Sequence, residues 1–133
     1  MSERSAVTPQ GLHQWMASDA AVWKSLPSGS EADAAMDSRD QAETERKWLR
    51  EHESVQRLLS SVTTSDMERK LVKEIAEAAF RKAFEASHHP ELAGLVSDDL
   101  QLLAGALVVG YRSPTLEKLW QAYSEGRFPL SVS

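Results

Sequence analysis

The Glu85-x-x-His88 pattern is the feature of this sequence closest to a metal-binding motif. A glutamate three residues before a histidine places both side chains on one face of a helix, as in the di-metal carboxylate centres of helix bundles. Such a centre needs a second pair, but neither His13 nor His52 follows a glutamate at that spacing. Histidine near a helix end also commonly complements the helix dipole. A helical metal-binding enzyme is therefore a second alternative only, and we predict no metal and no cofactor.

No other pattern in the sequence indicates catalysis. There is no Gly-x-Ser-x-Gly nucleophile turn and no phosphate-binding glycine loop, and the six glycines are scattered. The absence of cysteine excludes disulfides, thiol catalysis and cysteine-ligated zinc, and a cytoplasmic protein is the simplest interpretation. We therefore predict that the chain is not an enzyme.

The net charge of −5 is concentrated in one segment. Residues 31–53 hold eight acidic and four basic side chains, so four of the five excess negative charges lie there. Proteins that bind nucleic acid generally present a basic face, so this distribution argues against nucleic acid as the partner. It suits a larger protein with a basic surface.

Trp48 lies within this charged segment and has two interpretations. It could be the first core anchor of a helix, because Leu49 and Val55 continue an apolar stripe. It could also be an aromatic hot spot rimmed by charge, since tryptophan is enriched at binding sites. The candidate partner-binding residues are therefore Glu43, Glu45, Trp48 and Glu51.

The clearest structural element is a helix over residues 65–87. Ser65 and Glu68 form a capping box, and apolar residues recur at helical spacing behind it. Phe80 and Phe84 extend this apolar stripe, so we expect them to face the core.

One long polar helix is expected over residues 31–60. Its second half is amphipathic, so 48–62 should pack on the core, whereas 31–47 should project as an acidic arm. Self-association through 31–62 is compatible with this arrangement. Residues 1–7 are expected to be loose, and the pair Thr8-Pro9 is a good helix start.

The C-terminal third predicts two helices. Ser97 should cap a helix over 98–109, and Ser113-Pro114 should begin a last helix that stops at Gly126. Together, residues 98–127 form a helix-turn-helix-like unit, so a DNA-binding regulator is the first alternative function. The second of these helices is poor in the side chains that read DNA bases, which favours an ordinary helical hairpin. Residues 128–133 should be a loose tail.

The expected fold is therefore all-α: a single-domain irregular helical bundle of five or six helices over residues 1–133. The longest apolar stretch, 100–111, is interrupted by a glutamine and two glycines, so we expect no membrane span. By elimination, and from the acidic segment, we expect a non-catalytic interaction protein. Such a protein binds a larger partner and regulates, inhibits or assembles it, as immunity proteins, inhibitors and adaptors do.

Overall fold

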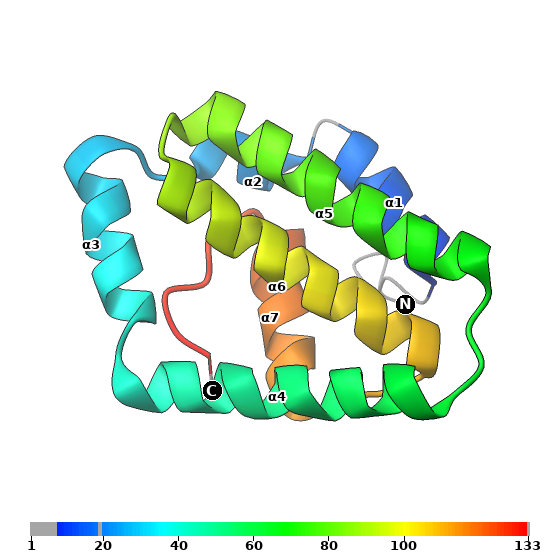
Figure 1. The fold of residues 1–133 in the computed structure, drawn as a ribbon. Coiled ribbons are helices and arrows are strands. Elements are labelled where there is room, and N and C mark those ends of the chain that lie inside the picture. Colours follow the sequence, from blue (N-terminus) through cyan, green and yellow to red (C-terminus); the bar gives the residue numbers. More distant parts are fainter. Residues whose placement is uncertain (1–7, 19, 133) are drawn as a thin grey trace.

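The computed structural model describes residues 8–18 and 20–132, and the regular structure of these residues is entirely α-helical (Figure 1). The all-α prediction is therefore confirmed. The described residues form seven helices: α1 (Pro9–Ala17), α2 (Ala21–Ser25), α3 (Gly29–Arg39), α4 (Ala42–Ser61), α5 (Asp66–Ser87), α6 (Pro90–Val109) and α7 (Pro114–Ser124). Residues 1–7, expected to be loose, lie outside the described residues.

Helix α5 begins and ends as the sequence predicts. The Ser65 hydroxyl accepts a hydrogen bond from the Glu68 backbone N–H at 3.0 Å, and the Glu68 carboxylate accepts one from the Ser65 N–H at 3.0 Å. This capping box satisfies two N–H groups that have no partner within the helix. At the other end, His88 adopts a left-handed conformation with φ of 54°. Pro90 follows two residues later and begins the next helix.

The pairing of α5 with α6 forms the centre of the molecule, and α6 lies between α5 and α4 in Figure 1. Ala79 and Ala83 are fully buried on the inner face of α5. Their small side chains let the two helix backbones approach closely. The hydroxyl of Ser97 on α6 donates to the Ala76 carbonyl on α5 at 2.7 Å.

The prediction that Phe80 and Phe84 face the core is wrong. Each side chain is 40% exposed, and the two rings stack with centroids 6.2 Å apart. The inner face of α5 is occupied by the alanines at 79 and 83, so the next residue along the chain in each case falls on the flank of the helix.

Helix α6 starts earlier than the sequence predicts. The N-cap is His89, whose ring Nδ1 accepts a hydrogen bond from the Leu92 N–H at 3.0 Å, and Pro90 occupies the first turn. Ser97 therefore lies in the middle of the helix, where its hydroxyl bonds to α5. The helix is continuous through residues 91–97 because proline is well tolerated in a first helical turn.

Helix α6 is also long and apolar enough to cross a membrane by length and composition, with a mean hydropathy of 1.6. The sequence predicted no stretch long and apolar enough to span a membrane, and that prediction is wrong by length and composition. Ten of its residues are buried inside the protein, and the helix contacts α1, α3, α4, α5 and α7. Such burial on several sides accounts for its apolar composition as a core helix.

The segment expected as one long helix is two helices. Helix α3 ends at Arg39, and α4 begins at Ala42 in a different direction (Figure 1). Residues 31–47 do not form a projecting arm, because Ala32, Ala35 and Arg39 are buried.

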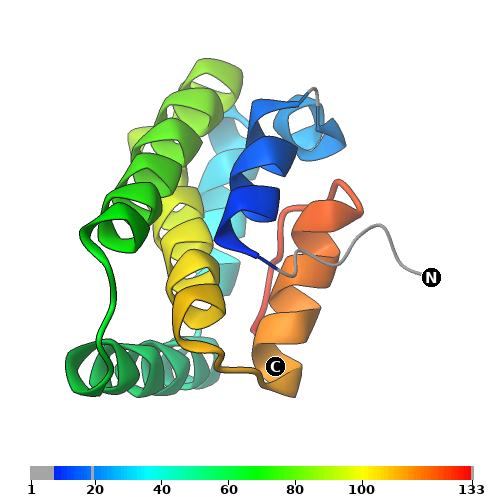
Figure 2. The ribbon, with the colours of Figure 1, turned by 90° about the vertical axis from the view of Figure 1, so that its right-hand side faces the viewer.

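The C-terminal end is packed rather than loose. Helix α7 begins after the N-cap Ser113 and ends before Gly126, as predicted. Figure 2 shows the following segment running back beside α7. Phe128 and Val132 are buried, and the Leu130 carbonyl accepts a hydrogen bond from Ser38 of α3 at 2.9 Å. The tail therefore holds α3 against the bundle.

Candidate functional site

A buried carboxylate, Asp99 of α6, joins four helices. Its side chain is fully buried. It accepts two hydrogen bonds from Arg39 of α3, each at 2.8 Å. It also accepts one from the indole N–H of Trp48 at 2.9 Å and one from the hydroxyl of Tyr123 at 2.6 Å. We call Asp99, Arg39, Trp48 and Tyr123 the Asp99 network.

The charges of the Asp99 network compensate one another. Burial disfavours the charged form of Arg39, but the adjacent Asp99 carboxylate outweighs this effect and raises the pKa of Arg39 above its ordinary value. Burial, with the nearby Asp99 charge, raises the pKa of Tyr123 well above 10, so its hydroxyl stays a donor. The Arg39 guanidinium also donates to the Pro129 carbonyl at 3.2 Å. The network therefore fixes α3 and the tail relative to α6.

The inward orientation of Arg39 changes the surface of α3. Across residues 31–45, all of which the structure describes, Arg39 is the only basic residue, and it is buried. The acidic side chains of α3 and its C-cap remain exposed. No exposed cation from residues 31–45 offsets their negative charge. We call these side chains the α3 acidic surface: Glu31, Asp33, Asp37 and Asp40. One of them, Asp33, approaches the His89 ring at 2.8 Å.

The sequence allowed Trp48 to be either a core anchor or an aromatic binding residue, and in the structure its side chain has features of both. It packs against the core and bonds to Asp99, so it is a structural anchor. It is only partly buried, and its ring stacks on His52 with centroids 5.1 Å apart and planes at 13°. Part of its aromatic surface therefore remains at the exterior of α4.

The candidate glutamates of α4 lie in different environments. Glu43 and Glu45 are exposed in the first turn, near the α3 acidic surface, and Glu43 approaches Lys47 at 3.7 Å. Glu51 is buried and accepts hydrogen bonds from the hydroxyls of Tyr111 at 3.1 Å and Ser113 at 2.7 Å. Glu51 therefore holds the turn before α7. Partner binding through Glu43, Glu45, Trp48 and Glu51 stays a prediction.

Replacement of Glu51 should affect stability. In Glu51→Ala the hydroxyls of Tyr111 and Ser113 lose their acceptor, and we expect a loss of about 1–3 kcal/mol in the free energy of unfolding. Urea denaturation of the variant and wild type measures this loss. Glu53→Ala, on the exposed side of the same helix, is the matched control and should change stability by less than about 0.5 kcal/mol. Equal stability of the two variants would contradict a structural role for Glu51.

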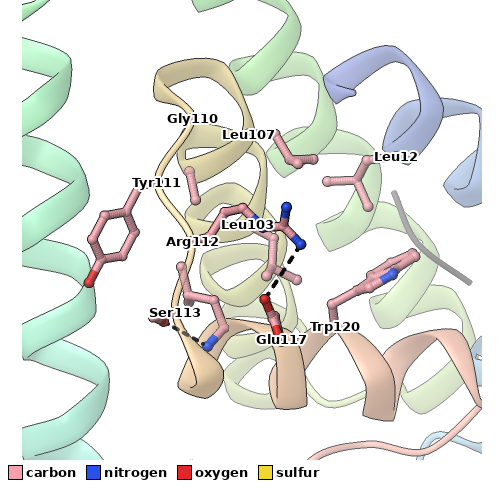
Figure 3. A pocket seen from close by; sticks show the side chains of 11 residues that line it. Leu12, Leu103, Leu107, Gly110, Tyr111, Arg112, Ser113, Glu117 and Trp120 are labelled. Carbon is pink, nitrogen blue, oxygen red and sulfur yellow. Dashed lines mark hydrogen bonds and ion pairs between the residues drawn. The ribbon is translucent and has the colours of Figure 1, made fainter. Parts of the chain in front are cut away.

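A pocket of about 240 Å³ lies between α1, the end of α6 and α7 (Figure 3). Its walls are largely apolar, and Arg112 approaches Glu117 at 3.6 Å beside them. Figure 3 shows the Tyr111 ring pointing away from the pocket toward α4, where it meets Glu51. The Ser113 hydroxyl, which also lines the pocket, donates to the same carboxylate at 2.7 Å.

The alternative functions, DNA binding and metal binding, depend on two arginines beside α7 and on His88. Arg112 and Arg127, the cations flanking α7, both approach carboxylates of the same hairpin, at 3.6 Å to Glu117 and 2.6 Å to Glu125. Their charge is thereby partly offset, which weakens the case for phosphate contact.

His88 is the C-cap of α5 and lies edge-on to Phe84. Among the described residues, no group of three or more histidine, aspartate or glutamate side chains could hold a metal ion.

The Asp99 network was not found by the sequence reasoning. One signal was available: an aspartate inside the most apolar helix must be either exposed or paired. Arg39 gives a second signal, as the single cation within residues 31–45. Their pairing across 60 residues of sequence required the fold.

The chain was also compared with models of known protein families. The family model described as "Immunity protein PIM1" matches residues 12–130, which include most of α1, all the other helices and most of the C-terminal tail. The comparison with curated proteins found no match.

Proposed function

The chain belongs to the immunity protein PIM1 family, and on that premise we propose that it neutralises a protein toxin by binding to it. The observation that carries this proposal is the family match over nearly the whole described bundle. Membership of an immunity protein family supports an inhibitor role and a protein partner. It also favours a non-catalytic mechanism, in which occupation of the toxin surface blocks activity.

The α3 acidic surface supports a partner with a basic surface. Its carboxylates are exposed, and Arg39, the cation that would offset them, is held inside the bundle by Asp99. Glu43 and Glu45 extend the negative surface into the first turn of α4. Like-charged surfaces repel and opposite ones attract, so such a surface steers a basic partner and excludes acidic ones. A cytoplasmic site of action is part of this proposal.

Affinity capture tests the proposal. The purified chain is immobilised and exposed to lysate of the source organism at low and at high salt, and retained proteins are identified by mass spectrometry. We expect a stoichiometric toxin that is retained at low salt and weakened at high salt, because exposed charge pairs are screened. Retention of nucleic acid alone, or of further copies of this chain alone, would contradict toxin binding and favour the DNA-binding or self-association alternatives.

A further inference from the structure

Asp98 of α6 is a carboxylate without a bonding partner. In the part of the chain that the structure describes, it makes no hydrogen bond and no ion pair. The side chain of Asp98 is exposed, but the surrounding protein removes part of its hydration and thereby raises the pKa of its carboxyl; the neighbouring Asp99 charge raises this pKa further, and His52 lowers it. Its ionised form is therefore less stabilised here than in water.

An aromatic pair on α4 lies close enough to this carboxylate for the charge of His52 to act on it. His52 stacks on Trp48, and both rings are partly exposed. The Trp48 indole N–H is bonded to Asp99, which immediately follows Asp98 in the chain. That bond holds the indole in place before any partner arrives, so ordering it costs little on binding. We call Trp48, His52 and Asp98 the Trp48 cluster.

We propose that the Trp48 cluster receives an arginine side chain of the toxin. The guanidinium of arginine is planar and stacks on aromatic rings, and its fork of N–H donors matches a carboxylate. It is also weakly hydrated, so it enters a partly desolvated site more readily than a lysine ammonium. An acidic side chain would be repelled by Asp98, and an apolar one would cover that carboxylate without offering it a partner.

The proposal rests on the proposed function and gives it a second contact. The α3 acidic surface supplies long-range attraction, whereas the Trp48 cluster supplies a specific anchor on neighbouring α4 and α6. A tryptophan, partly buried and already fixed, is the type of residue that carries a large share of binding energy in protein interfaces.

The proposal is tested with N-acetyl-arginine amide as the probe. The ¹⁵N-labelled protein is titrated with it, and the Trp48 indole N–H signal is followed; the neutral isostere N-acetyl-citrulline amide is the chemical control. We expect a saturable shift at Trp48 and His52 with the arginine compound only. The shift should vanish in Asp98→Asn and persist in Glu53→Gln, a matched variant on the exposed side of α4. An equal response to citrulline, an unchanged response in Asp98→Asn, or no response at the solubility limit would overturn the proposal.

Asp98→Asn also separates this proposal from the proposed function. Because the fold raises the pKa of this carboxyl, the folded state loses stability as the pH rises through that pKa, and removal of the charge does not destabilise the protein at neutral pH. With the captured toxin, Asp98→Asn should bind about tenfold or more weakly, while Glu53→Gln binds normally. If wild type neutralises the toxin and Asp98→Asn does so equally, the arginine site is wrong and the function stands. If wild type binds no toxin, the proposed function is wrong. The arginine site is then tested by the titration with N-acetyl-arginine amide alone.

Discussion

Asp99→Asn should lower the free energy of unfolding by about 3–5 kcal/mol, the largest loss we expect from a single polar substitution. The carboxylate accepts four hydrogen bonds, and its charge compensates a buried guanidinium. An asparagine has nearly the same shape but leaves the charge of Arg39 buried and unpaired. Its amide N–H groups would also face the side chains of Arg39, Trp48 and Tyr123, which are themselves donors and need an acceptor there.

Urea denaturation at neutral pH measures this loss, and Asp98→Asn is the adjacent control with no expected loss. A double variant, Arg39→Met with Asp99→Leu, should recover part of the stability, because it removes both charges and leaves no unpaired ion. The recovery should be incomplete, because the Trp48 indole and the Tyr123 hydroxyl lose their acceptor. If Asp99→Asn unfolds at the same urea concentration as wild type, the network does not hold α3 in place.

Reversal of charge on α3 should have the largest effect on toxin binding. Glu31→Lys, Asp37→Lys and Asp40→Lys together replace three exposed carboxylates by ammonium groups. Against a basic partner surface this converts attraction into repulsion, which costs several kcal/mol, so we expect affinity to fall by about 100-fold or more. Asp33 is left unchanged because of its contact with His89. The thermal melt should stay close to that of wild type, since exposed positions contribute little to stability.

The matched control carries the same change of net charge on another helix. Glu74→Lys, Glu77→Lys and Glu85→Lys reverse three exposed carboxylates of α5. Binding kinetics with the captured toxin at physiological salt compare the two triple variants. A similar loss of affinity in both would mean that net charge, rather than the α3 acidic surface, governs binding.

The parts of the fold that the sequence predicts are those governed by local chemistry. The capping box of Ser65 and Glu68 and the Ser113-Pro114 start of α7 each depend on residues a few positions apart. Their hydrogen bonds form within one helical turn, so spacing alone indicates them. The amphipathic stripe of α5 likewise indicates a helix before any partner is known.

The remaining features depend on contacts between distant residues. The direction in which Arg39 points is decided by Asp99, 60 positions later, and nothing near Arg39 indicates it. Glu51 resembles any exposed glutamate of a charged helix until the turn before α7 is placed against it. The sequence predicted an acidic segment that extends through α4. In the structure the net negative charge lies on α3 and its C-cap, because the exposed glutamates of α4 are accompanied by Arg46, Lys47 and Arg50.

The most direct test of toxin neutralisation is titration of the captured toxin's own activity with the purified chain. We expect activity to fall linearly and to disappear at one equivalent of wild-type chain. The triple charge reversal on α3 should move this end point to a large excess. A toxin that stays fully active in excess wild-type chain, although bound to it, would contradict neutralisation by binding.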